Sequence, residues 1–116
     1  MATSDKCCTI GPYFNLTDET LPKFKAACKE FVAMKNNEDK VLFYGFSFND
    51  NEAHCSEGYA DAEGVLAHFG NVGEKLMQAL EYTELTKLEI HGPAEELAKL
   101  KDLDMTYFEL EYGFRG

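Results

Sequence analysis

The residues best suited to chemistry in this chain are His68 and Glu57. His68 lies about two turns into a predicted apolar helix, where an imidazole can act as a general base or hydrogen-bond donor near neutral pH. Glu57 is the polar exception among apolar neighbours of a predicted strand, so its burial is costly unless His68 or a tyrosine lies within reach. We expect the two side chains to lie together, either as a catalytic pair or as a structural hydrogen bond.

A second set of side chains is suited to an apolar pocket for a small molecule. Tyrosine hydroxyls can donate to a ligand oxygen, and phenylalanine rings supply apolar walls. The predicted ligand-binding residues are Tyr44, Phe46, Phe48, His54, Tyr59, Phe69 and Tyr107. For any single aromatic residue, packing in the core or in a dimer is the competing interpretation. His54 belongs to the pocket if it lies on the inner face of its strand, and faces solvent otherwise.

The cysteine and histidine spacing does not indicate a metal site. The four cysteines include no C-x-x-C pair, and the neighbours Cys7 and Cys8 point to opposite faces of a strand. We expect reduced, mostly buried thiols and no metal. The sequence also has no Gly-rich phosphate loop, no serine nucleophile elbow and no dinucleotide fingerprint, so we predict no cofactor.

Composition limits the partners that the chain can have. Its 11 Lys and Arg residues against 21 Asp and Glu residues give a formal net charge of -10, which disfavours nucleic acid and anionic membranes. No apolar run approaches the roughly 20 residues that span a bilayer. The segment 1–6 is short and polar and lacks the apolar stretch of a secretory signal, so we expect a cytoplasmic protein.

Hydrophobic periodicity and turn residues predict one α+β domain over residues 1–116. The order is β-α-β-β-α-β, as in ferredoxin-like folds, followed by an extra helix and strand. The predicted elements are a strand at 7–16, a helix from Asp18 or Thr20 to about 35, a hairpin of strands at 41–48 and 53–59, a helix from Asp61 that breaks at 70–73, a strand at 85–91, a helix at 94–103 and a strand at 105–114.

The hairpin places large apolar residues on both faces of the predicted sheet. A turn centred on Asp50-Asn51 puts one set on one side: Leu42, Tyr44, Phe46, Phe48, Ala53, Cys55, Glu57 and Tyr59. The other side then carries Val41, Phe43, Gly45, Ser47, His54, Ser56 and Gly58. Two helices cover only one face of such a sheet. An apolar open face is an aggregation hazard in a monomer, so we expect a homodimer.

With this element order, the stretch Glu57-x-Tyr59-x-Asp61 followed by His68 resembles the dimeric α/β-barrel superfamily, which includes the antibiotic biosynthesis monooxygenase domains. The likeness covers nearly the whole chain. It implies two sheets packed face to face in a dimer, a last strand that reaches the partner, and a pocket for a hydrophobic small molecule between sheet and helices.

Two functions follow from this resemblance. The first is a binding protein for a fatty-acid-like or polyketide-like ligand, and the second is a cofactor-independent monooxygenase or isomerase in which His68 moves a proton. The oxygenase and haem-degrading members use an Asn on the first strand together with a Trp and a His. This chain has no Trp, and Asn15, the residue that matches the Asn, falls at the end of its strand.

Overall fold

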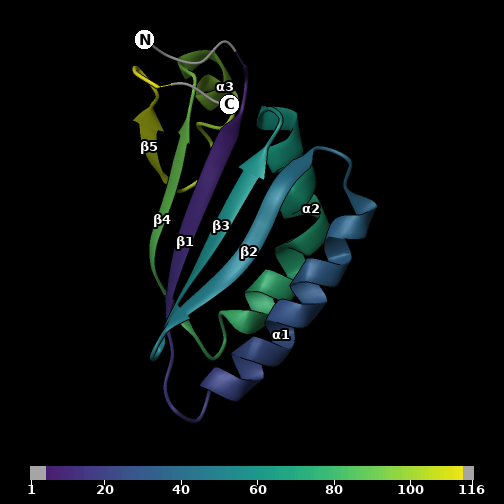
Figure 1. Cartoon of the computed structure of the whole chain (residues 1–116), viewed down its shortest axis with the longest axis vertical. Helices are drawn as coiled ribbons and strands as arrows, with labels where there is room; N and C mark the ends of the chain where they lie inside the picture. The colour runs from purple at the N-terminus through teal and green to yellow at the C-terminus, as the bar shows by residue number, and fades with distance from the viewer. Residues whose placement is uncertain (1–4, 114–116) are drawn as a thin grey trace.

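The computed structural model describes residues 5–113, which form one five-stranded sheet with helices on one face (Figure 1). The elements are β1 (Cys8–Asn15), α1 (Leu21–Met34), the short 3-10 helix η1 (Lys35–Asn37), β2 (Val41–Asn49), β3 (Glu52–Tyr59), α2 (Ala62–Ala79), β4 (Glu84–Gly92), α3 (Ala94–Ala98) and β5 (Thr106–Glu109). The strand order is β2-β3-β1-β4-β5, with β5 parallel to β4 and the other pairs antiparallel. The ferredoxin-like order of the first six elements is confirmed.

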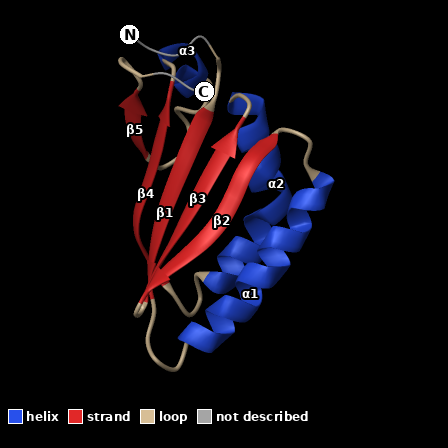
Figure 2. Ribbon diagram, viewed as in Figure 1, coloured by secondary structure: helices blue, strands red, loops and turns tan. Residues whose placement is uncertain are grey.

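The long helices α1 and α2 lie side by side on the same face of the sheet, while the opposite face of the described chain carries no helix (Figure 2). The last helix is shorter than the predicted 94–103, because the chain passes into turns after Ala98. The last strand is also shorter than the predicted 105–114, and Phe114 lies outside the described residues.

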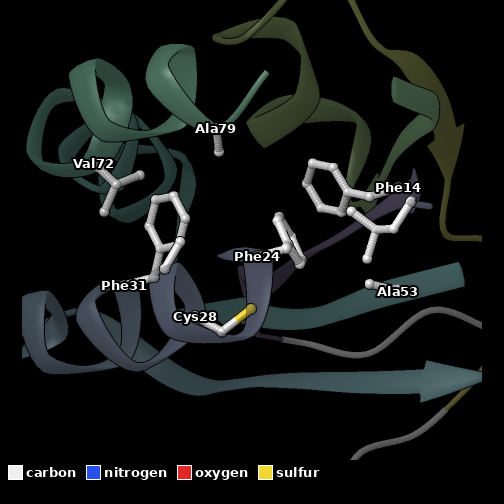
Figure 3. Packing of buried hydrophobic residues seen from close by; sticks show 9 residues of the cluster. Phe14, Phe24, Cys28, Phe31, Ala53, Val72 and Ala79 are labelled. Atoms are coloured by element: carbon white, nitrogen blue, oxygen red, sulfur yellow. The ribbon is translucent and has the colours of Figure 1, made fainter. Parts of the chain in front are cut away.

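Two clusters of buried side chains hold the helices on the sheet. The first lies between α1, α2 and the sheet, where Phe24 is fully buried and its ring centroid is 5.0 Å from that of Phe14 (Figure 3). The second lies towards the other end of α2 and joins β1, β3, β4 and α3 through Ile10, Tyr59, Val65, Ile90, Leu97 and Leu100. Burial of these apolar surfaces is the main stabilising contribution to the fold.

The β2–β3 hairpin has the predicted two-residue turn, with Asp50 in the left-handed region at φ 51°. Its register pairs Tyr44 with Glu57 and Phe46 with Cys55, which turns these side chains towards the helices. The predicted assignment of side chains to the two faces of the hairpin is wrong at the start of β2. An irregularity between Val41 and Phe43 shifts the register, so that Val41 packs against the second cluster and Leu42 is 56% exposed.

The predicted break in the second long helix is also wrong, because α2 is continuous from Ala62 to Ala79. Asp61 caps it by accepting a hydrogen bond from the Gly64 N–H at 3.0 Å. The two glycines at the predicted break, Gly70 and Gly73, cost about 1 kcal/mol each relative to alanine. Burial of the apolar face of α2 outweighs this cost, with Val65 and Val72 almost inaccessible to solvent.

The expectation of buried thiols is confirmed, since Cys7, Cys8, Cys28 and Cys55 are all buried, and each is free in the structure. None of the helices within residues 5–113 has the length and apolar character that crossing a membrane requires.

Candidate functional site

A narrow cavity of about 40 Å³ lies between the sheet and the helices, at the junction of the two buried clusters. Its walls are mainly apolar: Ile10, Pro12, Phe14, Phe31, Phe46, Phe69, Val72, Leu76, Leu85 and Leu88. Four groups with a polar atom open onto it, namely Tyr44, Cys55, Glu57 and His68. This volume holds a few water-sized groups, so it fits the reacting end of a ligand better than a whole drug-sized molecule.

His68 and Glu57 meet at this cavity. Alternation along β3 turns Cys55, Glu57 and Tyr59 towards the helices, and helical spacing places His68 on the same face of α2 as Val65 and Val72. The His68 Nε2 lies 3.4 Å from the Glu57 Oε1, and the two side chains are only 4% and 6% exposed. The two residues therefore lie together, as the sequence analysis expects; a catalytic role for either stays a prediction.

A third buried ionisable residue, Glu38, was missed by sequence reasoning. It follows η1, and both of its carboxylate oxygens lie within 3.2 Å of the His68 Nδ1. The Asn71 side-chain amide donates to Glu38 Oε2 and to the Met34 carbonyl oxygen, both at 2.8 Å, which fixes Glu38 between the end of α1 and α2. A glutamate in an Asn-Asn-Glu-Asp segment is typical of an exposed turn, so the local sequence carries no signal of its burial.

The contacts on both ring nitrogens set the orientation of His68. With Glu38 ionised, its carboxylate accepts from the Nδ1–H, which leaves Nε2 directed at Glu57. On the far side of Glu57, the Tyr59 hydroxyl donates to Oε1 at 2.6 Å. Four buried side chains are therefore connected by successive polar contacts, in the order Glu38–His68–Glu57–Tyr59, and we call this group the relay. A relay of this kind can hold a proton at more than one position.

Burial sets the protonation preferences in the relay. Desolvation raises the pKa of the Glu57 carboxyl, although His68 and the Tyr59 and Cys55 hydrogen bonds act in the opposite direction. Burial, and then the Glu57 charge, raise the pKa of the Tyr59 phenol, which therefore remains a donor. Burial likewise raises the pKa of Tyr44. A carboxyl held towards its neutral form beside an imidazole is an arrangement suited to acid–base chemistry.

The raised pKa of Glu57 gives a first prediction. Because the folded protein holds this proton more tightly than the unfolded chain, the associated stability is present below the ordinary pKa of 4.5 and is lost as the pH rises. We expect Glu57→Gln, which mimics the neutral carboxyl, to gain stability relative to the wild type as the pH rises from about 4.5 towards 8. Urea unfolding of both proteins across this range measures the difference. A stability difference that stays constant with pH would contradict the prediction.

Tyr44 is the predicted ligand-binding residue best placed to contact a ligand. Its ring centroid is 5.0 Å from that of His68, and its side chain lines the cavity. Among the residues that the structure describes, its hydroxyl has no hydrogen-bond partner. Phe46 and Phe69 also line the cavity, Phe46 on β2 and Phe69 next to His68 on α2.

The other four predicted ligand-binding residues do not line this cavity. Phe48 lies nearer the hairpin turn and is 36% exposed. Tyr59 is fully buried behind Glu57, and the Tyr107 hydroxyl donates to the carbonyl oxygens of Leu100 and Leu103. His54 lies on the open face of the sheet, where its ring contacts that of Tyr13 at 4.4 Å. A ligand-binding role for these residues stays a prediction.

The ionisable groups of the described residues are not arranged as a metal site. Within residues 5–113, no three His, Cys, Asp or Glu side chains are grouped so that they could hold a metal ion. Asn15, the residue matched to the asparagine of the oxygenases, is exposed at the end of β1 and contacts Glu84 rather than the cavity.

Comparison with known proteins finds similarity to solved structures. The chain is 38% identical to MupZ from Pseudomonas fluorescens, with a TM-score of 0.91 over 97% of this chain and 96% of that one. A putative antibiotic biosynthesis monooxygenase from Nitrosomonas europaea is 12% identical, with a TM-score of 0.67 over 78% of this chain and 93% of that one.

A protein of unknown function from Bacteroides thetaiotaomicron, described as a possible oxidoreductase, is 20% identical. Its TM-score is 0.66 over 75% of this chain and 97% of that one. These last two likenesses show the shared fold alone. No protein-family model and no curated protein sequence matches the chain.

Proposed function

Since the chain belongs to the dimeric α/β-barrel superfamily of antibiotic biosynthesis monooxygenase-like, ferredoxin-like proteins, we propose that its cavity binds a hydrophobic small molecule of a fatty-acid-like or polyketide-like kind. The apolar walls from β1, α1, α2 and β4 support this proposal, because they supply the burial that an apolar ligand requires. The Tyr44 hydroxyl, which has no hydrogen-bond partner within residues 5–113, can donate to a ligand oxygen.

We further propose that the bound molecule is a substrate on which His68 and Glu57 move a proton. The observation that carries this is the relay, in which His68 is held between two buried carboxyl groups at the wall of the cavity. In this scheme the His68 Nε2 accepts a proton from the substrate, while the neutral Glu57 carboxyl donates one to a developing oxyanion.

Proton transfer of the isomerase type fits this site better than the oxygenase chemistry of the superfamily. The residue matched to the oxygenase asparagine, Asn15, lies outside the cavity, and the sequence contains no tryptophan. The groups that do line the cavity are an imidazole, a carboxyl and a phenol, which are general acids and bases.

A native mass spectrum of the purified protein tests the binding proposal. We expect the mass of the protein plus a small organic molecule that is retained under gentle conditions and lost on denaturation. The variant Leu88→Phe, which enlarges a side chain of the cavity wall, should lose this extra mass while the circular dichroism spectrum remains that of a folded protein. Equal retention by the wild type and Leu88→Phe would place the ligand elsewhere.

We also propose that the open face of the sheet is the interface of a homodimer. Phe43 on β2 and Phe108 on β5 are 46% and 43% exposed, and the Phe108 ring stacks on that of His91 at 4.7 Å. The Phe43 ring occupies the space where a Cβ of Gly58 would lie, so the glycine lets it pack against the strand. Aromatic side chains exposed on a sheet face favour association with a second copy.

The dimer proposal predicts that Phe43→Glu or Phe108→Glu yields monomer or insoluble protein, because the interface would then contain unpaired carboxylates. Leu66→Glu, at a 47% exposed position on α2, introduces the same change on the helical side and should leave the dimer intact. Light scattering measures the mass of each variant. A wild-type protein that remains monomeric at all concentrations would contradict the proposal.

A further inference from the structure

The charges around the cavity limit what its ligand can be, an argument that rests on the binding function proposed above. No lysine or arginine is among the described residues that line the cavity. Its ionisable wall consists of Glu57 and His68, and Glu38 adds a second buried carboxylate on the far side of the imidazole. With His68 protonated and both carboxylates ionised, one positive charge faces two negative charges, and protonation of Glu57 brings the sum only to zero.

The neighbouring cations are engaged outside the cavity. Lys40 pairs with Asp61 at 2.9 Å and with Glu63 at 3.1 Å, and Lys75 pairs with Glu30. Neither lysine is therefore free to neutralise an anion that enters the cavity.

The N-terminus of α2 does not provide an anion site either. Its Gly64 N–H donates to the Asp61 carboxylate and its Ala62 N–H donates to the Glu96 Oε1, each at 3.0 Å. These carboxylates occupy the position that a ligand anion would take at a helix N-terminus.

A ligand carboxylate in this cavity would be desolvated next to Glu57, and the one cation it could meet, a protonated His68, already contacts both Glu38 and Glu57, which strongly disfavours its binding. A neutral oxygen meets better partners. The Tyr44 hydroxyl can donate to a carbonyl or ether oxygen, and Glu57 can accept from a ligand hydroxyl or, when protonated, donate to a carbonyl. The cavity therefore offers hydrogen bonds to uncharged oxygen groups without the cost of placing an anion beside the buried carboxyl groups of Glu57 and Glu38.

We propose that the cavity selects uncharged, oxygen-bearing apolar ligands, such as alcohols, ketones and esters, and rejects free carboxylates. Of the two proposed kinds of ligand, fatty-acid-like and polyketide-like, this selectivity favours a polyketide-like molecule with a neutral reacting end. It disfavours a free fatty acid that would insert its carboxylate into the cavity.

The test compares three probes with six-carbon chains, whose oxygen-bearing ends are small enough to enter the cavity: 1-hexanol, 2-hexanone and hexanoate. At about pH 8 hexanoate is fully ionised. Amide chemical shifts of ¹⁵N-labelled protein, titrated with each probe, report both affinity and location. We expect 1-hexanol and 2-hexanone to shift cavity residues and to bind at least about tenfold tighter than hexanoate, because only hexanoate brings a charge into the cavity.

Two variants identify the source of the discrimination. Glu57→Gln and Glu38→Gln each remove one buried carboxylate, so each should narrow the ratio of 1-hexanol to hexanoate affinity. Glu74→Gln changes the net charge of the protein equally at an exposed position of α2, and should keep the wild-type ratio.

Three results would overturn the inference. Hexanoate binding in the cavity as tightly as 1-hexanol would do so while leaving the binding function in place. If Glu57→Gln and Glu38→Gln both keep the wild-type ratio of 1-hexanol to hexanoate affinity, the buried carboxyl groups do not cause the discrimination. If none of the three probes shifts cavity residues, the proposed binding function fails, and the inference fails with it.

Discussion

Replacing His68 by glutamine is expected to lower turnover of the natural substrate by about 10²–10⁴-fold, the usual contribution of a general acid or base. The two ring nitrogens of His68 contact Glu38 and Glu57. A glutamine side chain can form hydrogen bonds in this place, but its amide cannot take up and release a proton as an imidazole does. Turnover is measured with the molecule that the native mass spectrum identifies. Ligand binding should change much less than turnover, because the apolar walls are unaltered.

Stability measurements on the same variant separate a catalytic role of His68 from a structural one. A double-mutant cycle with His68→Gln and Glu57→Gln should give a coupling free energy on the order of 0.5–3 kcal/mol, since the two groups are in contact. Additive effects would mean that the two side chains do not interact in solution. If His68→Gln lowers the melting temperature but leaves turnover unchanged, the structural interpretation is correct.

Removing the Glu38 side chain is expected to have the largest effect on stability. In Glu38→Ala, the His68 Nδ1 loses its acceptor inside the protein and the Asn71 amide keeps only the Met34 carbonyl oxygen; breaking a buried pair of this kind costs about 3–5 kcal/mol. Glu38→Gln keeps an acceptor oxygen and should lose less. The free energy of unfolding in urea measures both variants.

Glu63→Ala is the matched control for Glu38→Ala. Glu63 also contacts a basic side chain, that of Lys40, but Glu63 is 77% exposed, so its removal should cost no more than about 1 kcal/mol. Equal losses in Glu38→Ala and Glu63→Ala would contradict the assignment of Glu38 as the buried residue that positions His68.

The parts of this account that were predictable from sequence depend on local patterns. Alternation in the hairpin and helical spacing in 61–80 place Glu57 and His68 on facing surfaces, and the two-residue turn at Asp50-Asn51 fixes the register between them. The ferredoxin-like order follows from the same periodicities. These features are determined within single elements or between neighbouring ones.

The parts that were not predictable depend on packing between distant segments. The irregularity that exchanges Val41 and Leu42 arises where β2 pairs with the end of β3, and no residue type marks it. Glu38 is buried between the end of α1 and α2. The Asn71 side chain on α2 holds it there, because its amide donates both to Glu38 and to the Met34 carbonyl oxygen at the end of α1. Continuity of α2 through its glycines likewise comes from burial of its apolar face rather than from helix propensity.

The measurement that tests the central claim most directly is the imidazole ¹⁵N spectrum of the protein during titration with 1-hexanol. The claim is that His68, held with its Nδ1–H on Glu38, faces the ligand through Nε2. His54 and His91 lie at the open face and serve as internal references. We predict a protonated Nδ1 on His68 and a titration shift of its Nε2 alone. Binding that moves amide signals but leaves both His68 nitrogens unchanged would contradict the account.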